Sequence, residues 1–238
     1  MKFRTPEALV AMAVALVLLG TLILVAILMQ RGGTGSIESI PAALANQAAP
    51  AQVQVAVAPP TTHRASGFQA SQSWVVQTAQ SSGISPIAIA AYGDATLRIG
   101  SEQPSCHLGW STLAGIGTVE SGNGTFGGRA LLADGTSSSP ITGPALNGVG
   151  GNAAISNGNG GWSSALGPMQ FIQSTWDKWG AGGDVNNIFD AALAAGRYLC
   201  ADGRDLSSAQ GWTAAIFSYN HDVKYVQNVY AAANAAAR

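Results

Sequence analysis

The sequence predicts a mainly α-helical domain that contains one long glycine-rich loop or small β insert and follows a single transmembrane helix. Three observations lead to this expectation: an uncharged apolar run near the N-terminus, helical spacing of apolar residues after about residue 71, and a glycine-rich interruption of that spacing. We therefore divide the chain into a cytoplasmic tip and membrane anchor (1–30), a flexible linker (31–69) and a folded domain (70–238).

The apolar run extends from Ala8 to Met29 without a charged residue. A helix of this length crosses a hydrocarbon core of about 30 Å. A secretory signal peptide has a shorter apolar region with a small-residue cleavage site directly after it, whereas this run ends in Met29-Gln30-Arg31. We therefore expect an uncleaved anchor, and cleavage near Ala43-Leu44-Ala45 is the alternative, which would give a secreted protein.

The basic residues around the run set its expected orientation. Lys2 and Arg4 precede it, and Arg31 alone follows it closely. Because positive charge stays on the cytoplasmic side, we expect a cytoplasmic N-terminus and an extracytoplasmic domain.

The low charge of the chain excludes some functions. Only 10% of the residues are charged, the formal net charge is -1, and 47% of the residues are hydrophobic. A nucleic-acid-binding protein shows a clustered basic surface, and a disordered chain has low hydrophobicity and high net charge. Neither class fits this composition.

The linker and the folded domain differ in pattern. Residues 31–69 are rich in Ala, Gln, Pro, Gly and Thr and show no helical period. After them, apolar residues recur at helical spacing, with Asn187 and Asp222 as expected N-caps. The expected helices cover about 71–79, 84–97, 109–121, 168–179, 187–203, 212–219 and 222–230.

The stretch between residues 122 and 166 lacks this spacing. It holds 12 glycines from Gly122 to Gly161, with Ser, Asn and Pro filling much of the rest. A loop of this length inside a compact domain is unusual and tends to be functional or disordered. We expect it to form the long loop or small β insert.

Glu120 is the strongest candidate for chemistry. It is one of two glutamates after the linker, and it follows Leu113 by seven and Ile116 by four residues, which places it on the apolar stripe of its helix. Burial raises the pKa of a carboxyl group toward neutrality, as a general acid requires. The commoner alternative is a buried glutamate that is hydrogen-bonded to the backbone.

The two cysteines, Cys106 and Cys200, both lie in the domain that we expect to be exported. An oxidising compartment favours a disulfide between them, and two free buried thiols are the alternative. No Cys or His residues occur in the close pairs that zinc requires, so we expect no metal.

Three short motifs resemble those of a known family. Glu120-Ser121, Gly167-Pro168-Met169-Gln170 and Ser218-Tyr219-Asn220 are similar, in order, to the ES, GLMQ and AYN motifs of lytic transglycosylases and goose-type lysozymes. Over roughly residues 70–235 the chain looks like the B-type murein transglycosylases of bacteria, including their pair of cysteines.

The resemblance implies a lysozyme-like domain that cleaves the β-1,4 bond between N-acetylmuramic acid and N-acetylglucosamine in peptidoglycan. Glu120 would act first as acid and then as base, and the product would carry a 1,6-anhydro ring without a cofactor. Tyr219 is expected to hydrogen-bond near Glu120. The residues implied to bind substrate are Ser121, Met169, Gln170, Tyr219 and Asn220.

Several alternatives stay open at this point. A muramidase on the same fold would hydrolyse the same bond, and a non-catalytic module would only bind peptidoglycan. For Met169 and Tyr219 the alternative role is ordinary core packing. The calcium-loop-like run of B-type relatives is reduced here to Asp184, Asn186 and Asn187, so we expect no structural calcium. The expected partners are peptidoglycan strands and, through the N-terminal helix, the membrane, with no nucleic acid.

Overall fold

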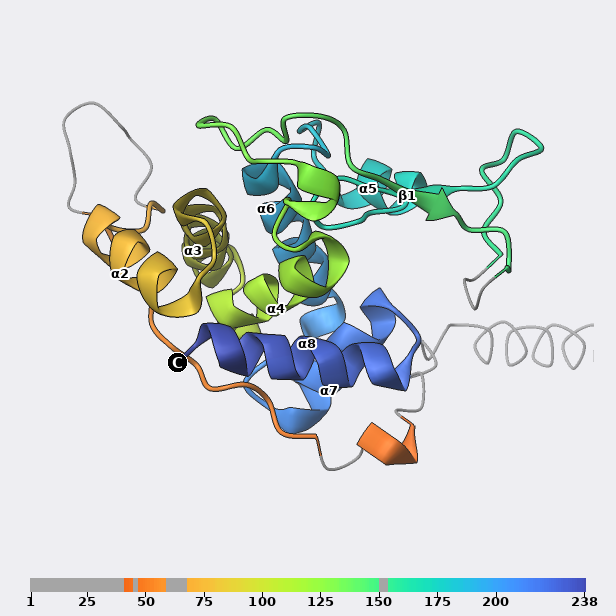
Figure 1. The fold of residues 1–238 in the computed structure, drawn as a ribbon. Coiled ribbons are helices and arrows are strands. Elements are labelled where there is room, and N and C mark those ends of the chain that lie inside the picture. Colours follow the sequence, from red (N-terminus) through yellow and green to blue (C-terminus); the bar gives the residue numbers. More distant parts are fainter. Residues whose placement is uncertain (1–40, 45–46, 59–67, 150–153) are drawn as a thin grey trace, which may run out of the picture. The chain divides into compact units, whose positions relative to one another are not determined.

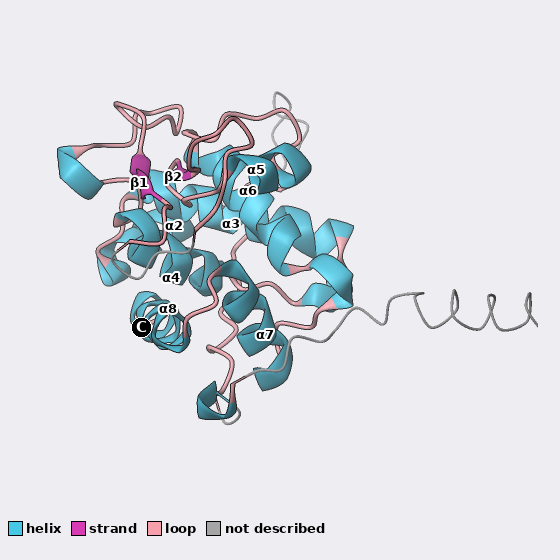
Figure 2. Ribbon diagram, turned by 90° about the vertical axis from the view of Figure 1, so that its right-hand side faces the viewer, coloured by secondary structure: helices cyan, strands magenta, loops and turns pink. Residues whose placement is uncertain are grey.

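The computed structural model describes residues 41–44, 47–58, 68–149 and 154–238. This part of the chain is mainly helical and includes one small two-stranded sheet (Figures 1 and 2). The predicted membrane segment, Ala8–Met29, lies outside the described residues. Within them, no helix has both the length and the apolar character that a bilayer-spanning segment needs.

The helices occur where the apolar spacing predicts them, with adjusted ends. Ser71, Ser85, Asn187, Ser208 and Asp222 each cap a helix by accepting a backbone N–H bond, so the two predicted caps are confirmed. The α-helices are α2 (Gln72–Ser82), α3 (Pro86–Glu102), α4 (Trp110–Ser121), α5 (Gln173–Trp179), α6 (Ile188–Leu199), α7 (Ala209–Tyr219) and α8 (Val223–Ala236). Short 3-10 helices cover η1 (Ala42–Leu44), η2 (Pro104–Cys106), η3 (Phe126–Gly128) and η4 (Ala201–Gly203).

Helix α4 forms the centre of the domain. Its residues Trp110–Gly117 are all buried, and it packs most extensively against α8 and also against α3 (Figure 1). Gly115 allows this approach, because a Cβ atom at this position would lie 2.7 Å from the backbone oxygen of Val229 in α8. The catalytic candidate Glu120 therefore belongs to a helix whose first two turns are enclosed in the core.

The predicted helix 168–179 is too long at its start. Leu166 and Phe171 exchange two backbone hydrogen bonds of 2.8 and 2.9 Å, and Gln170 has a φ of 51°, so the residues between them form a turn. Gly167 is required in this turn, because its φ is 71° and an added Cβ atom would lie 1.8 Å from the oxygen of Val185. Helix α5 consequently begins only at Gln173.

The glycine-rich stretch is a loop with a small β insert, as expected. Strand β1 (Thr142–Ala145) pairs antiparallel with β2 (Ser164–Leu166). Figures 1 and 2 show these strands on the side of α4 that is opposite α7. The insert thereby leads back into the turn at Gly167–Gln170.

Part of the stretch that we predicted as a flexible linker is folded against the domain. Leu44 is only 1% exposed and joins the hydrophobic core, and Ala49 and Val55 pack against that core. The N–H of Ala58 donates to the carbonyl oxygen of Gln69, and the N–H of Ser71 donates to that of Ala56, which fixes the end of this segment. Residues 41–58 thus belong to the folded unit where they are described, because their apolar side chains find core contacts that composition alone does not reveal.

The predicted disulfide is confirmed. Cys106 and Cys200 are bonded, with a Cα–Cα distance of 5.5 Å and a sequence separation of 94 residues. The bond joins η2, directly after α3, to the end of α6. Two elements that are distant in sequence are thereby held together beside the core.

Candidate active site

Glu120 lies in the last turn of α4, directly before the glycine-rich loop begins. Leu113 and Ile116 on the same face are fully buried, as the stripe predicts. Gly122 ends the helix in the left-handed conformation, with its N–H bonded to the carbonyl oxygens of Gly117 and Thr118. The carboxylate therefore sits where a buried helix meets an irregular loop.

The surroundings of Glu120 favour its protonated form. Burial raises the pKa of Glu120 from 4.5 to about 7, and a hydrogen bond from the hydroxyl of Tyr225 opposes that rise. Within the described residues, no cation and no second carboxylate contributes to this shift. Desolvation alone thus brings the carboxyl group into the range that a general acid uses near neutral pH.

Tyr225 is a site residue that sequence reasoning missed. Its hydroxyl donates a hydrogen bond of 2.6 Å to Oε1 of Glu120. Burial and the nearby carboxylate raise the pKa of Tyr225 well above its usual value, so it remains a donor. The sequence indicates only that Tyr225 faces inward, because it lies in the first turn of the last helix on the same face as Val226 and Val229. This spacing does not identify Glu120 as its hydrogen-bond partner.

Ser121 joins the first motif to the second. Its buried hydroxyl donates a bond of 2.6 Å to the carbonyl oxygen of Pro168 and accepts one of 2.8 Å from the N–H of Gly124. This hydroxyl thus acts as both a hydrogen-bond donor and an acceptor within the protein. Ser121 thus holds the turn at Gly167–Gln170 against the end of α4.

Tyr219 joins the third motif to the second. Its hydroxyl donates a bond of 2.7 Å to the carbonyl oxygen of Met169, and its ring stacks on that of Tyr225 at an interplanar angle of 5°. Tyr219 therefore stacks on the tyrosine that contacts Glu120, and the hydrogen bond to Glu120 itself comes from Tyr225 and not from Tyr219. The side chain of Met169 is fully buried in the core, as the core-packing alternative for this residue predicts.

The two amide residues of the motifs make no hydrogen bond to Glu120. Gln170 is half-buried, and its Nε2 donates to the oxygen of Gly167 at 2.8 Å. Asn220 is exposed at the end of α7. The structure therefore assembles Glu120, Ser121, Tyr219 and the turn around Met169, with Gln170 and Asn220 at its margin.

Asn123 is a second structural residue that the sequence did not identify. It adopts a φ of 58° directly after the Gly122 cap and is buried. Its Oδ1 accepts a bond of 2.9 Å from the hydroxyl of Tyr92, and its Nδ2 donates to Thr118. These bonds fix the chain just beyond Glu120 and so limit how the carboxylate can move.

The side chains of the calcium-loop-like run at Asp184 and Asn186 accept hydrogen bonds from nearby backbone N–H groups. Asp184 accepts a bond from the N–H of Asn186, and Asn186 accepts one from Ile141 in the insert. Across the described residues, no group of three or more His, Cys, Asp or Glu side chains is placed to hold a metal ion.

The chain was also compared with known proteins. No protein-family model, no curated protein and no solved structure matches it. The features of the chain that bear on its activity are therefore the geometry around Glu120 and the order of its three motifs.

Proposed function

We propose that this protein is a lytic transglycosylase of peptidoglycan, with a lysozyme-like domain anchored to the outer face of the cell membrane by the residues before the linker. The observation that carries the proposal is Glu120, a desolvated carboxyl group with a pKa of about 7 that lies between a buried helix and a long loop. The motif residues that surround it support the same assignment.

The reaction follows from the two protonation states of Glu120. The protonated carboxyl group gives its proton to the oxygen of the β-1,4 bond, and the C1–O bond of the muramic acid breaks. The 6-hydroxyl of the same sugar then bonds to C1, and its proton returns to the Glu120 carboxylate. The group begins and ends protonated, and no water is consumed.

The missing second carboxylate supports this route. Most glycosidases place two acids around the scissile bond, and substrate-assisted families are the exception. In the described part of the chain, no second carboxylate is close enough to shift the pKa of Glu120. In the proposed reaction, the N-acetyl group of the muramic acid stabilises the positive charge at C1 in place of the missing acid.

Tyr225 and Tyr219 act as positioning residues in this scheme. The hydrogen bond from Tyr225 orients Oε1 of Glu120 and stabilises its charged form after proton transfer. Tyr219 stacks on Tyr225 and holds the turn at Met169. Both rings belong to the C-terminal elements α7 and α8, which therefore complete a site that begins on α4.

Product analysis tests the proposal. Purified sacculi are digested with the full chain, and the soluble muropeptides are examined by mass spectrometry. We expect 1,6-anhydro products, each lighter by one water molecule than the hydrolysed form. Reducing-end products would instead indicate a muramidase, and an absence of soluble products together with binding to sacculi would indicate a non-catalytic module.

A further inference from the structure

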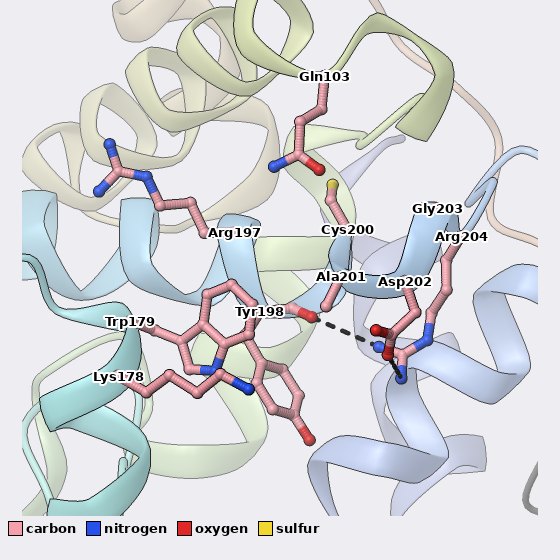
Figure 3. Close-up of a pocket in the computed structure, with 10 residues that line it drawn as sticks. All are labelled: Gln103, Lys178, Trp179, Arg197, Tyr198, Cys200, Ala201, Asp202, Gly203 and Arg204. Carbon is pink, nitrogen blue, oxygen red and sulfur yellow. Dashed lines mark hydrogen bonds and ion pairs between the residues drawn. The ribbon is translucent and has the colours of Figure 1, made fainter. Parts of the chain in front are cut away.

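A pocket of about 420 Å³ lies outside the elements that carry Glu120 (Figure 3). It is formed by the end of α5, the end of α6 and the turn η4, beside the disulfide. A pocket of this size accommodates a small ligand or one end of a longer one. The lining residues that concern its chemistry are Gln103, Lys178, Trp179, Arg197, Tyr198 and Arg204.

The lining of this pocket carries a net positive charge in a chain whose net charge is -1. Lys178, Arg197 and Arg204 contribute three positive charges, and Asp202 is the one carboxylate that lines it. The Asp202 side chain is 85% exposed, so solvent screens it. The pocket therefore favours an anionic ligand.

Arg204 has bonding capacity to spare. Its side chain is only 23% exposed, yet its contacts are long, at 3.4 Å to the carbonyl oxygen of Tyr198 and 3.7 Å to Asp202. A guanidinium group carries five N–H donors in a fork that matches a carboxylate. Arg197 is more fully used, because its Nε and Nη2 atoms both lie 3.5 Å from the carboxylate oxygens of Glu102.

The placement of the cations in the pocket favours a ligand with separated negative charges. Figure 3 shows Trp179 and Lys178 on one side and Arg204 on the other. The Nζ atom of Lys178 lies 5.0 Å from the centre of the Trp179 ring. Cationic groups at two separate points, with an aromatic ring next to one of them, suit an aliphatic chain with separated carboxylates better than a single phosphate.

We propose that this pocket binds the carboxylate groups of a short peptide and, on the basis of the proposed function, that this peptide is the stem attached to the muramic acid. The stem carries several carboxylates along a short chain, which matches the arrangement of Arg204 and Lys178. The pocket would then select strands by their peptides, separately from the cleavage of the sugar bond.

A row of aromatic rings connects the pocket with the candidate active site. Tyr198 lines the pocket and contacts both Trp179 and Tyr219 edge-on, with ring centres 6.0 and 5.5 Å apart. Its hydroxyl also donates to the carbonyl oxygen of Ser218, the first residue of the third motif. Because Tyr219 stacks on Tyr225, a ligand against Tyr198 contacts the same row of rings that positions Glu120.

The test measures binding and turnover separately. The free stem tetrapeptide, without sugar, is titrated calorimetrically into the full chain in detergent, with inorganic phosphate as a parallel ligand. We expect the peptide to bind and both Arg204→Met and Lys178→Met to weaken its binding about tenfold, as the loss of a charge-assisted contact predicts. Arg238→Met removes an exposed charge that does not line the pocket and should change the affinity less than about twofold.

Turnover of glycan strands tests whether the bound peptide is the stem of the strand. With peptide-bearing strands, Lys178→Met and Arg204→Met should raise KM and leave kcat unchanged, whereas strands stripped of peptide by an amidase should show no change in KM. Retained kcat also shows that the variants fold.

Four results would overturn the proposal or part of it. The peptide site is refuted by any of three results: no peptide binding, unchanged affinity in both pocket variants, or phosphate binding as tight as that of the peptide. Each of these results is decisive even if Glu120-dependent cleavage of strands is intact. Peptide binding without any cleavage would instead remove the assignment to the cell-wall stem and contradict the proposed function.

Discussion

The ends of helices α3 and α4 each carry a glutamate, and the two side chains are in opposite situations. Glu102 ends α3 and is ion-paired with Arg98 and Arg197, and the hydrogen bond from Arg98 lowers the pKa of its carboxyl group. Glu120 lies one residue before the end of α4 and contacts Tyr225, and burial raises its pKa to about 7. The same residue type at nearly the same helical position is therefore held charged in one place and can take up a proton near neutral pH in the other.

This difference shows which features make a carboxyl group suitable for acid catalysis. Position at a helix C-terminus is common to both and does not distinguish them. What differs is the charge around them: Glu102 meets Arg98 of its own helix and Arg197 of α6, whereas Glu120 contacts Tyr225 of α8, a helix whose buried residues are all uncharged. The absence of a cation and the loss of water leave Glu120 able to exchange a proton near neutral pH.

The largest expected effect is on catalysis. Glu120→Gln keeps the size of the side chain but removes the transferable proton, so it should lower cell-wall cleavage by about 10²- to 10⁴-fold. Glu102→Gln is the matched control and should retain nearly full activity. Release of soluble muropeptides from sacculi measures both. Substantial activity in Glu120→Gln, or an equal loss in both variants, would contradict the assignment.

The next effect is on the pH dependence of stability. Because the pKa of Glu120 is higher in the folded than in the unfolded state, the folded protein binds more protons between pH 4.5 and about 7, and stability falls as the pH rises through that range. By pH 8 the loss should reach up to about 3 kcal/mol relative to acidic pH. Chemical denaturation of wild type and Glu120→Gln at pH 4.5 and 8 measures it, and a parallel pH response in both proteins would refute the desolvation argument.

A smaller effect is expected from the tyrosine that contacts Glu120. Tyr225→Phe removes the hydrogen bond that lowers the pKa of Glu120, so the descending alkaline limb of the kcat/KM profile should move up by about one pH unit. Loss of orientation should also lower the maximal rate about tenfold. Tyr230→Phe removes a hydroxyl from the same helix and serves as control. An alkaline limb that stays in place would show that Tyr225 does not act on the Glu120 proton.

The smallest effect concerns Glu102. Its ion pairs are partly exposed, so Glu102→Gln should destabilise the protein by less than about 1 kcal/mol. The difference from wild type should shrink further in high salt because the charges are screened. Denaturation at low and high ionic strength measures this difference. A large loss of stability that does not depend on salt would contradict the description of Glu102 as a solvent-screened ion pair.

Much of this site could be predicted from the sequence because its positions depend on local patterns. The stripe through Leu113, Ile116 and Glu120 correctly identified an inward-facing carboxyl group, and the side-chain oxygens of Asn187 and Asp222 correctly identified two helix starts. The two cysteines correctly indicated a disulfide. Each of these inferences uses spacing along one element or a general property of the residue type.

The rest depends on contacts between distant segments. The bond from Tyr225 to Glu120 joins residues 105 positions apart, and no local pattern identifies such a pair. The turn at Gly167–Gln170 resembled a helix start because Pro168 suits the first turn of a helix, but pairing of Leu166 with Phe171 determines its shape. Leu44 likewise looked like part of a linker until its contact with the core was known.

Direct titration of the glutamate carboxyl groups tests the central claim. The chain contains only four glutamates, Glu7, Glu38, Glu102 and Glu120, so selective ¹³C labelling gives few NMR signals, which Glu→Gln variants assign. We expect the Glu120 signal to titrate near pH 7 and the Glu102 signal below its usual value of 4.5. Titration of both signals together near 4.5 would contradict the account.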